Sequence, residues 1–221
     1  MQAPPPDLLQ RAFDDPAPRS RLIAAMALAL FEKSYANISV ADVVRLARVS
    51  KRTFYEHFST SEACYLATYE ALSGTLLDRV EQTALSVPDV QERLREAVKT
   101  YLSSLQEVPA LARTFFLEIQ LAGPEALAAR RKVHHRFADM LRSIVHLGQE
   151  QGADIQPLSE DMAVAIVGAI NELMMVCIEE ERVHELTALQ STVVTLFEAL
   201  LRRPHVNYAA RQPLTAATLD D

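Results

Sequence analysis

The sequence has few residues that interrupt helices and few that favour strands. Only 5 of its 221 residues are glycine, aromatic residues make up 6%, and tryptophan is absent. Alanine, leucine, glutamate and arginine are abundant, and these residues favour helix over sheet. A sheet-rich fold is therefore a poor fit, and we expect an all-α protein.

Cysteine and long apolar runs are also scarce. The two cysteines, Cys64 and Cys177, lie far apart within helical patterns, so we expect reduced core thiols rather than a disulfide. The N-terminus MQAPPPDLL lacks the charged and apolar regions of a secretory signal. No apolar run approaches the roughly 20 residues of a membrane span. These absences predict a cytoplasmic protein without membrane contact.

Catalytic motifs are missing as well. The sequence contains no glycine-rich phosphate loop, no nucleophile elbow and no HExxH pattern. His134 and His135 are adjacent, so on a helix they point about 100° apart and cannot readily share a metal. We therefore expect no catalytic residues, no metal site and no cofactor, and an enzyme that uses an apolar cavity is the weakest alternative.

The most informative stretch is Ser39–Phe58, SVADVVRLARVSKRTFYEHF. Apolar residues spaced by three and four predict one helix before Arg48 and a second, shorter helix after Ser50. Phe54 and Phe58 define the inner face of the second helix. Two helices joined by a three- to four-residue turn have the dimensions of a helix-turn-helix. The outer face of the second helix carries five hydrogen-bonding side chains: Lys51, Arg52, Thr53, Tyr55 and His57.

Charge is distributed unevenly along the chain. Residues 19–58 contain seven arginines and lysines against three carboxylates, a net +4, whereas the whole chain carries −7. A basic module on an acidic body is typical of a protein that touches DNA with one end, although chance asymmetry is the alternative.

Helical periodicity continues beyond this module and predicts about nine helices in all. Capping patterns place helix starts after Ser39, Ser50, Ser59 and Asp89, with Ser59 and Glu62 forming a capping box. Proline-rich residues 1–18 predict a flexible arm, and residues 204–221 a loose tail.

Residues 19–70 resemble the DNA-binding domain of TetR-type transcriptional regulators. The resemblance rests on LFEKSYANISV, VVRLARVSKRTFYEHF and SEACYLATYE, in that order. It implies a helix-turn-helix domain at 19–60 and a ligand-binding and dimerisation bundle at 61–203. The family pairs its last two long helices across a homodimer, and the apolar stretch AVAIVGAINELMMVCI is consistent with such pairing, although a core helix of a monomer would look the same.

The resemblance also assigns site residues. The helix-turn-helix geometry and the resemblance together predict DNA contacts from Ser39, Arg48, Ser50, Lys51, Arg52, Thr53, Tyr55 and His57. Three positions depart from the family pattern, since Arg48 stands where glycine is usual, Ser34 where glycine is frequent and Ser61 where lysine is common. Arg48 would be strained if its position needs a positive φ, and the loss of the lysine would weaken sequence-independent affinity.

For the bundle, the resemblance implies a cavity for a small molecule. Its candidate lining is mostly apolar with a few polar groups, the usual form of such a site, although any one of these residues could simply be core. The candidates are Tyr69, Tyr101, Phe115, Phe116, Glu118, His134, Phe137, Met140, Asn171, Met174 and Cys177.

These observations predict a ligand-responsive regulator, most simply a repressor. It would bind a pseudo-palindromic operator in double-stranded DNA as a homodimer and be released by a small apolar or amphipathic effector. The main alternative is a helical small-molecule-binding or interaction protein of the same fold that does not bind an operator.

Overall fold

The computed structural model describes residues 15–202, and every named element in this range is helical. The N-terminal elements are α2 (Pro18–Glu32), η1 (Tyr35–Asn37), α3 (Val40–Ala47) and α4 (Lys51–His57). The long helices of the body are α5 (Ser61–Leu85), α6 (Val90–Gln106), α9 (Pro124–Glu150), α10 (Glu160–Glu179) and α11 (Gln190–Leu201). The shorter ones are α7 (Pro109–Arg113), η2 (Thr114–Glu118), α8 (Ile119–Leu121) and η3 (Val183–Leu189). The predicted all-α class is confirmed. The predicted arm up to residue 14 and the predicted tail from 204 lie outside the described residues.

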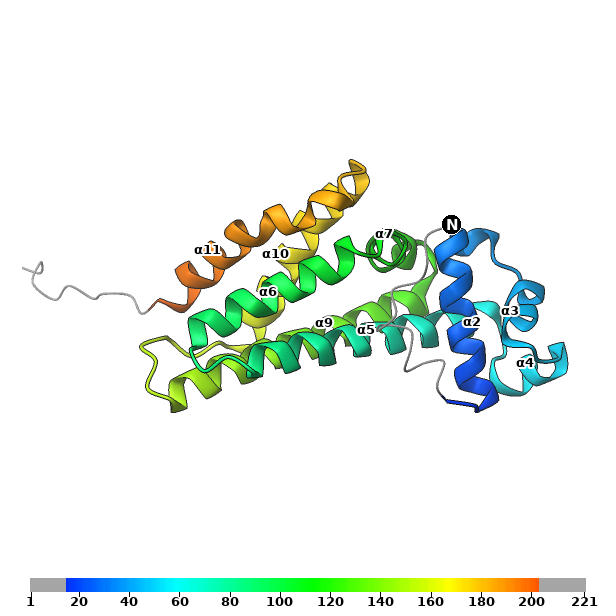
Figure 1. Cartoon of the computed structure of the whole chain (residues 1–221), viewed down its shortest axis with the longest axis horizontal. Helices are drawn as coiled ribbons and strands as arrows, with labels where there is room; N and C mark the ends of the chain where they lie inside the picture. Colours follow the sequence, from blue (N-terminus) through cyan, green and yellow to red (C-terminus); the bar gives the residue numbers. More distant parts are fainter. Residues whose placement is uncertain (1–14, 203–221) are drawn as a thin grey trace, which may run out of the picture.

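The three N-terminal helices form a compact head at one end of the molecule (Figure 1). They pack around a shared apolar core in which Leu22, Met26, Val43 and Phe54 are fully buried. The guanidinium of Arg19 lies 5.2 Å from the centroid of the Phe58 ring and covers this core from outside. Phe54 and Phe58 are therefore core residues, as the sequence indicates.

Most of the predicted helix starts are confirmed. The side chains of Ser39, Ser50 and Asp89 each accept a hydrogen bond from a backbone N–H of the helix that follows. The predicted capping box at Ser59 is wrong. Thr60 is the cap of α5, and its hydroxyl accepts from the N–H of Ala63.

The body consists of layered helices that extend away from the head (Figure 1). α5 leaves the head and runs alongside α9, α6 lies above them, and α10 and α11 lie on the far side of α6 and α9. Two irregular elements differ from the predicted continuous helices. η2 is a π-helical turn, and η3 is a 3₁₀ segment that precedes α11.

α10 is the most apolar helix of the body. Within residues 15–202 it is the one helix long and apolar enough to cross a membrane, with a mean hydropathy of 1.8. This feature is weak evidence for a membrane span, because a core helix of a globular protein passes the same test. Its inner face packs into the core through Ala163, Ile166, Ile170 and Met174.

Candidate nucleic-acid interface and internal cavity

The helix-turn-helix is held by hydrogen bonds at the starts of α3 and α4 and in the turn between them. Ser39 and Asp42 form a reciprocal capping box at the start of α3. The hydroxyl of Ser50 accepts from the N–H of Thr53 at 3.0 Å at the start of α4. Between them, the guanidinium of Arg21 donates to the carbonyl oxygens of Ala47 and Arg48. These bonds fix the angle at which α4 projects from the head.

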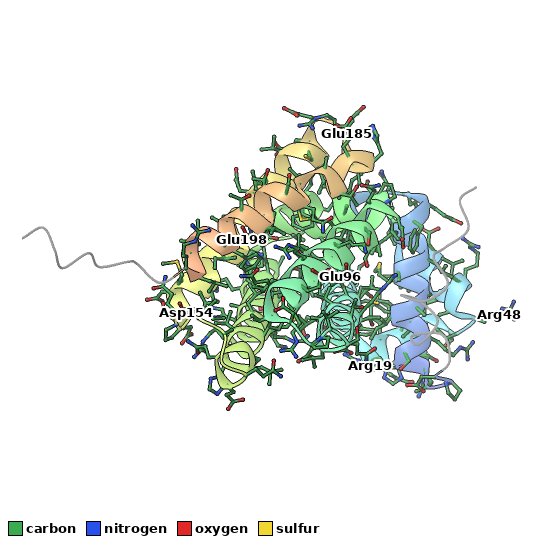
Figure 2. All side chains as sticks on the ribbon, turned by 60° about the vertical axis from the view of Figure 1, so that its left-hand side comes forward. Arg19, Arg48, Glu96, Asp154, Glu185 and Glu198 are labelled. Carbon is green, nitrogen blue, oxygen red and sulfur yellow. The ribbon has the colours of Figure 1, made fainter. Side chains whose placement is uncertain are left out.

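Arg48 ends α3 in a left-handed conformation, with φ 53° and ψ 47°. This is the geometry that favours glycine, because a Cβ crowds the following carbonyl oxygen. The position therefore does need a positive φ, as the resemblance suggested. In Figure 2 the Arg48 side chain points outward from the edge of the head into solvent.

The outer face of α4 is exposed and rich in hydrogen-bond donors. Lys51, Arg52 and His57 are exposed, and Tyr55 is exposed over 57% of its surface. The Nε of Arg52 donates to Oε1 of Glu56 at 3.1 Å, but both side chains are largely solvated. An exposed pair of this kind contributes little stability, so a phosphate or base edge can displace Glu56. This face can therefore donate to a polyanion that lies along α4.

The three predicted hydroxyl contacts are partly occupied. The hydroxyl of Ser39 donates to Asp42 at 2.6 Å, while those of Ser50 and Thr53 lie 2.9 Å apart. Lys33 also donates to Asp42, and these hydrogen bonds hold the pKa of the Asp42 carboxyl well below its usual range. Ser39 thus shares its site with a carboxylate and is a weaker candidate for a phosphate contact than the sequence implied.

The body encloses two adjoining hollows. The proximal hollow lies nearer the head, between α5, α6, η2, α9 and α10, and the distal hollow lies between α5, α6, α9, α10 and α11. Tyr101, Phe137, Val167 and Asn171 line both, so the hollows form one cavity with a constriction. Their free space is only about 20 and 40 Å³, of the order of one to a few water molecules. The cavity is therefore narrow in this structure.

Eight of the eleven predicted cavity residues line these hollows: Tyr69, Tyr101, Phe115, Phe116, His134, Phe137, Met140 and Asn171. The structure does not bring the other three there. Met174 and Cys177 are buried one to two turns further along α10, and Glu118 faces the head instead. Ten further lining residues were missed, nine of them small or aliphatic and one aromatic, since the sequence does not distinguish them from ordinary core: Ser73, Leu76, Val80, Ala97, Val98, Val133, Leu141, Val167, Ile170 and Phe197.

A chain of three polar side chains crosses the constriction. The amide nitrogen of Asn171 lies 2.8 Å from Nε2 of His134, and the Tyr101 hydroxyl donates to the Asn171 carbonyl oxygen at 3.4 Å. Burial and the nearby Arg130 charge lower the pKa of His134 to about 4. Burial also raises the pKa of the Tyr101 hydroxyl. His134 is therefore neutral at pH 7 and accepts from Asn171, while Tyr101 remains a donor.

Besides the packing of α5 on α2, a hydrogen bond joins η2, which forms part of the cavity wall, to the head. Phe115 and Phe116 of η2 line the proximal hollow, and Glu118 ends the same π-helical turn. Oε2 of Glu118 accepts from the backbone N–H of Tyr35 in η1 at 3.2 Å. The Tyr35 ring stacks on Tyr65 of α5 with centroids 4.1 Å apart. The Glu118 hydrogen bond thereby links η2 directly to the segment that leads into α3.

The described elements form a helix-turn-helix head on a helical body with an internal cavity. Residues 22–68 match the family model described as bacterial regulatory proteins, tetR family, and residues 87–175 match the tetracyclin repressor-like C-terminal domain. Together these ranges cover more than half of the chain. The chain belongs to the TetR family, whose members are DNA-binding regulators with a ligand-binding domain.

Individual relatives agree with this assignment. The regulator EthR of Mycolicibacterium smegmatis is 26% identical over 74% of this chain and 76% of its own length. The repressor DhaR of Mycobacterium sp. (strain GP1) is 23% identical over 83% of this chain and 92% of its own. Among solved structures, FadR from Bacillus subtilis in complex with stearoyl-CoA has a TM-score of 0.67 at 20% identity, covering 80% of this chain and 95% of that one. At this identity the structural likeness shows the fold alone.

Proposed function

We propose that the chain is a transcriptional repressor that binds a pseudo-palindromic operator as a homodimer and is released by a small apolar or amphipathic effector. One observation carries this proposal: α5 connects the donor-rich face of α4 to the narrow cavity. That helix begins at the end of the helix-turn-helix and contributes Tyr69, Ser73, Leu76 and Val80 to the hollows. Two relatives support the proposal by name, since DhaR is a repressor and FadR binds stearoyl-CoA.

The narrowness of the cavity supports release of DNA by the effector rather than recruitment to DNA. Free space of about 20 and 40 Å³ is too small for an acyl chain, so an effector that enters must push the surrounding helices apart. Displacement of α5 or η2 would change how the head sits on the body. An effector that prefers the expanded state disfavours the state seen here, and operator DNA must weaken the effector by the same factor.

The operator proposal is tested by DNA binding. DNA flanking the chain's own gene should bind the full-length protein with an affinity that falls steeply as salt rises. Arg52→Ala should weaken this binding about tenfold or more, because Arg52 lies where a recognition helix reads base edges. Tyr55→Phe, which removes only the phenol oxygen, should weaken it less.

The body offers a matched control. Arg142 is an exposed arginine on α9 that pairs with Asp139 at 3.4 Å, as Arg52 pairs with Glu56. Arg142→Ala should leave DNA affinity unchanged. If Arg52→Ala and Tyr55→Phe both bind such DNA as well as the parent protein, the assignment of α4 as the recognition helix is wrong.

A further inference from the structure

The cavity lacks any charged lining. Among the residues described around both hollows there is no carboxylate, ammonium or guanidinium group, and His134 is neutral at pH 7. Arg130, whose charge contributes to the lowered pKa of His134, is half-buried and lines neither hollow. An ionised group that entered either hollow would lose its hydration without gaining an opposite charge, which is strongly unfavourable. The lining therefore discriminates against ions of either sign.

The constriction nevertheless offers hydrogen bonds. The amide of Asn171 uses one N–H on His134, which leaves its second N–H. The hydroxyl of Tyr101 donates to Asn171 over 3.4 Å, a long contact that a better acceptor can replace. Both groups therefore present a donor at the point where the two hollows meet.

We infer that the part of the effector that enters this cavity is an uncharged molecule with one carbonyl or hydroxyl oxygen, which accepts from Tyr101 or Asn171, and an apolar chain, which occupies the distal hollow. Esters, thioesters, ketones and alcohols belong to this class, and free carboxylic acids, ionised at neutral pH, do not. The inference rests on the proposed function in taking this cavity as the effector site.

The distal hollow suits the chain because its lining is nearly all apolar. Val98, Met140 and Ile170 lie around it, and Asn171 is at its boundary with the proximal hollow. Met140 is unbranched and adapts its shape to a neighbour more easily than a β-branched residue does. Short chains, which need the least expansion, are therefore the appropriate probes.

The experiment compares three probes that share a chain of eight carbons. Methyl octanoate, 1-octanol and octanoate are titrated into the full-length protein at neutral pH, and heat is measured by calorimetry. Methyl octanoate and 1-octanol should bind, and octanoate should bind at least about tenfold more weakly, since desolvation of its carboxylate is uncompensated. The inference is overturned if octanoate binds as tightly as its methyl ester, or if neither uncharged probe binds up to its solubility limit.

Two variants test whether Asn171 and Tyr101 bind the oxygen of the effector. Asn171→Leu keeps a similar side-chain size without hydrogen-bonding groups and should weaken methyl octanoate about tenfold. Tyr101→Phe is a second, milder variant that retains the ring packed against Phe137. Ser104→Ala is the control. Ser104 lies one turn from Tyr101 and is fully buried, yet it lines neither hollow and its hydroxyl has no hydrogen-bond partner. Unchanged binding in both Asn171→Leu and Tyr101→Phe would overturn the inference.

A parallel DNA-binding measurement separates this inference from the proposed function. If the uncharged probes bind in the expected order but leave DNA affinity unaltered, the cavity chemistry is supported while its proposed role in release fails. If the protein binds DNA but shows no preference for the ester over octanoate, the inference fails and the operator proposal is unaffected.

Discussion

Arg48 has a strained backbone conformation, since it is a non-glycine residue at φ 53°. We predict that Arg48→Gly raises the free energy of unfolding by about 1 kcal/mol, because glycine has no Cβ to oppose the left-handed conformation. The hydrogen bond that its carbonyl accepts from Arg21 is retained. Urea denaturation of the two proteins measures the difference.

A second substitution separates strain from DNA contact. Arg48→Ala removes the same guanidinium but keeps a Cβ, so it should not gain stability. If Arg48 contacts a phosphate, both variants should bind DNA more weakly by a similar factor. A stability gain in Arg48→Ala equal to that in Arg48→Gly would contradict the strain argument.

The lowered pKa of His134 predicts that the stability of the protein depends on pH. Its pKa is lowered from 6.5 in the unfolded chain to about 4 in the folded protein, so between these values the unfolded state binds more protons. From this residue, stability should be constant above pH 6.5 and should fall as the pH decreases from 6.5 to 4. Thermal unfolding across this range measures the slope.

The matched variant for this prediction is His134→Gln. Its amide oxygen can accept from Asn171 in place of the imidazole nitrogen, but it does not titrate. The variant should show a shallower decrease in stability between pH 6.5 and 4 than the parent protein. Identical pH profiles would mean that His134 does not titrate as the structure indicates.

At the level of helices, Gly148 lets α9 and α6 approach closely. A Cβ added at Gly148 would lie 2.8 Å from Cβ of Val90, and closer still to one of its methyl groups. Gly148→Ala should therefore destabilise the protein by about 1–3 kcal/mol, the usual cost of overpacking a core.

Two further variants test whether contact with Val90 causes the loss of stability in Gly148→Ala. Gly74→Ala on α5 is the control, because its added Cβ would meet only the Arg136 guanidinium at an ordinary 3.5 Å. It should be neutral or stabilising, as expected for alanine in a helix. Val90→Ala combined with Gly148→Ala should recover part of the stability that Gly148→Ala loses. If no stability is recovered, the loss does not arise from the contact with Val90.

Local signals explain why the helices were largely predictable from the sequence. Ser39, Ser50 and Asp89 cap helices as their spacing indicates. The start of α5 was misplaced by one residue, since adjacent Ser59 and Thr60 are both good caps and only tertiary packing selects Thr60. The cavity depends on helix rotation and on the π-helical turn η2, and neither has a local signature. This is why Glu118 was expected beside the cavity and instead binds the Tyr35 backbone.

At the scale of the whole molecule, α10 presents a face that is apolar except for Glu172 and that no described residue covers. The exposed residues Met162, Ala165, Ala169, Glu172 and Val176 recur every three or four positions and form one stripe, which we call the α10 stripe. Met162 and Val176 are each exposed over 41% of their surface. Small residues at its centre allow a second helix to approach closely. The stripe supports the proposed homodimer, in which two α4 helices would meet half-sites about 34 Å apart.

Ala169→Arg tests this arrangement because it places a long cation at the centre of the α10 stripe. Ala169 is exposed in the single chain, so the substitution should leave the fold of the protomer intact. Sedimentation at micromolar concentration should show a dimer for the parent protein and a monomer for Ala169→Arg. Operator affinity should fall when dimerisation is lost, since a single head contacts only one half-site.

Leu127→Arg is the control. It changes an exposed apolar position on α9 outside the α10 stripe, so this variant should remain dimeric. A parent protein that sediments as a monomer would refute the dimer, and an Ala169→Arg protein that still dimerises would place the interface on another face.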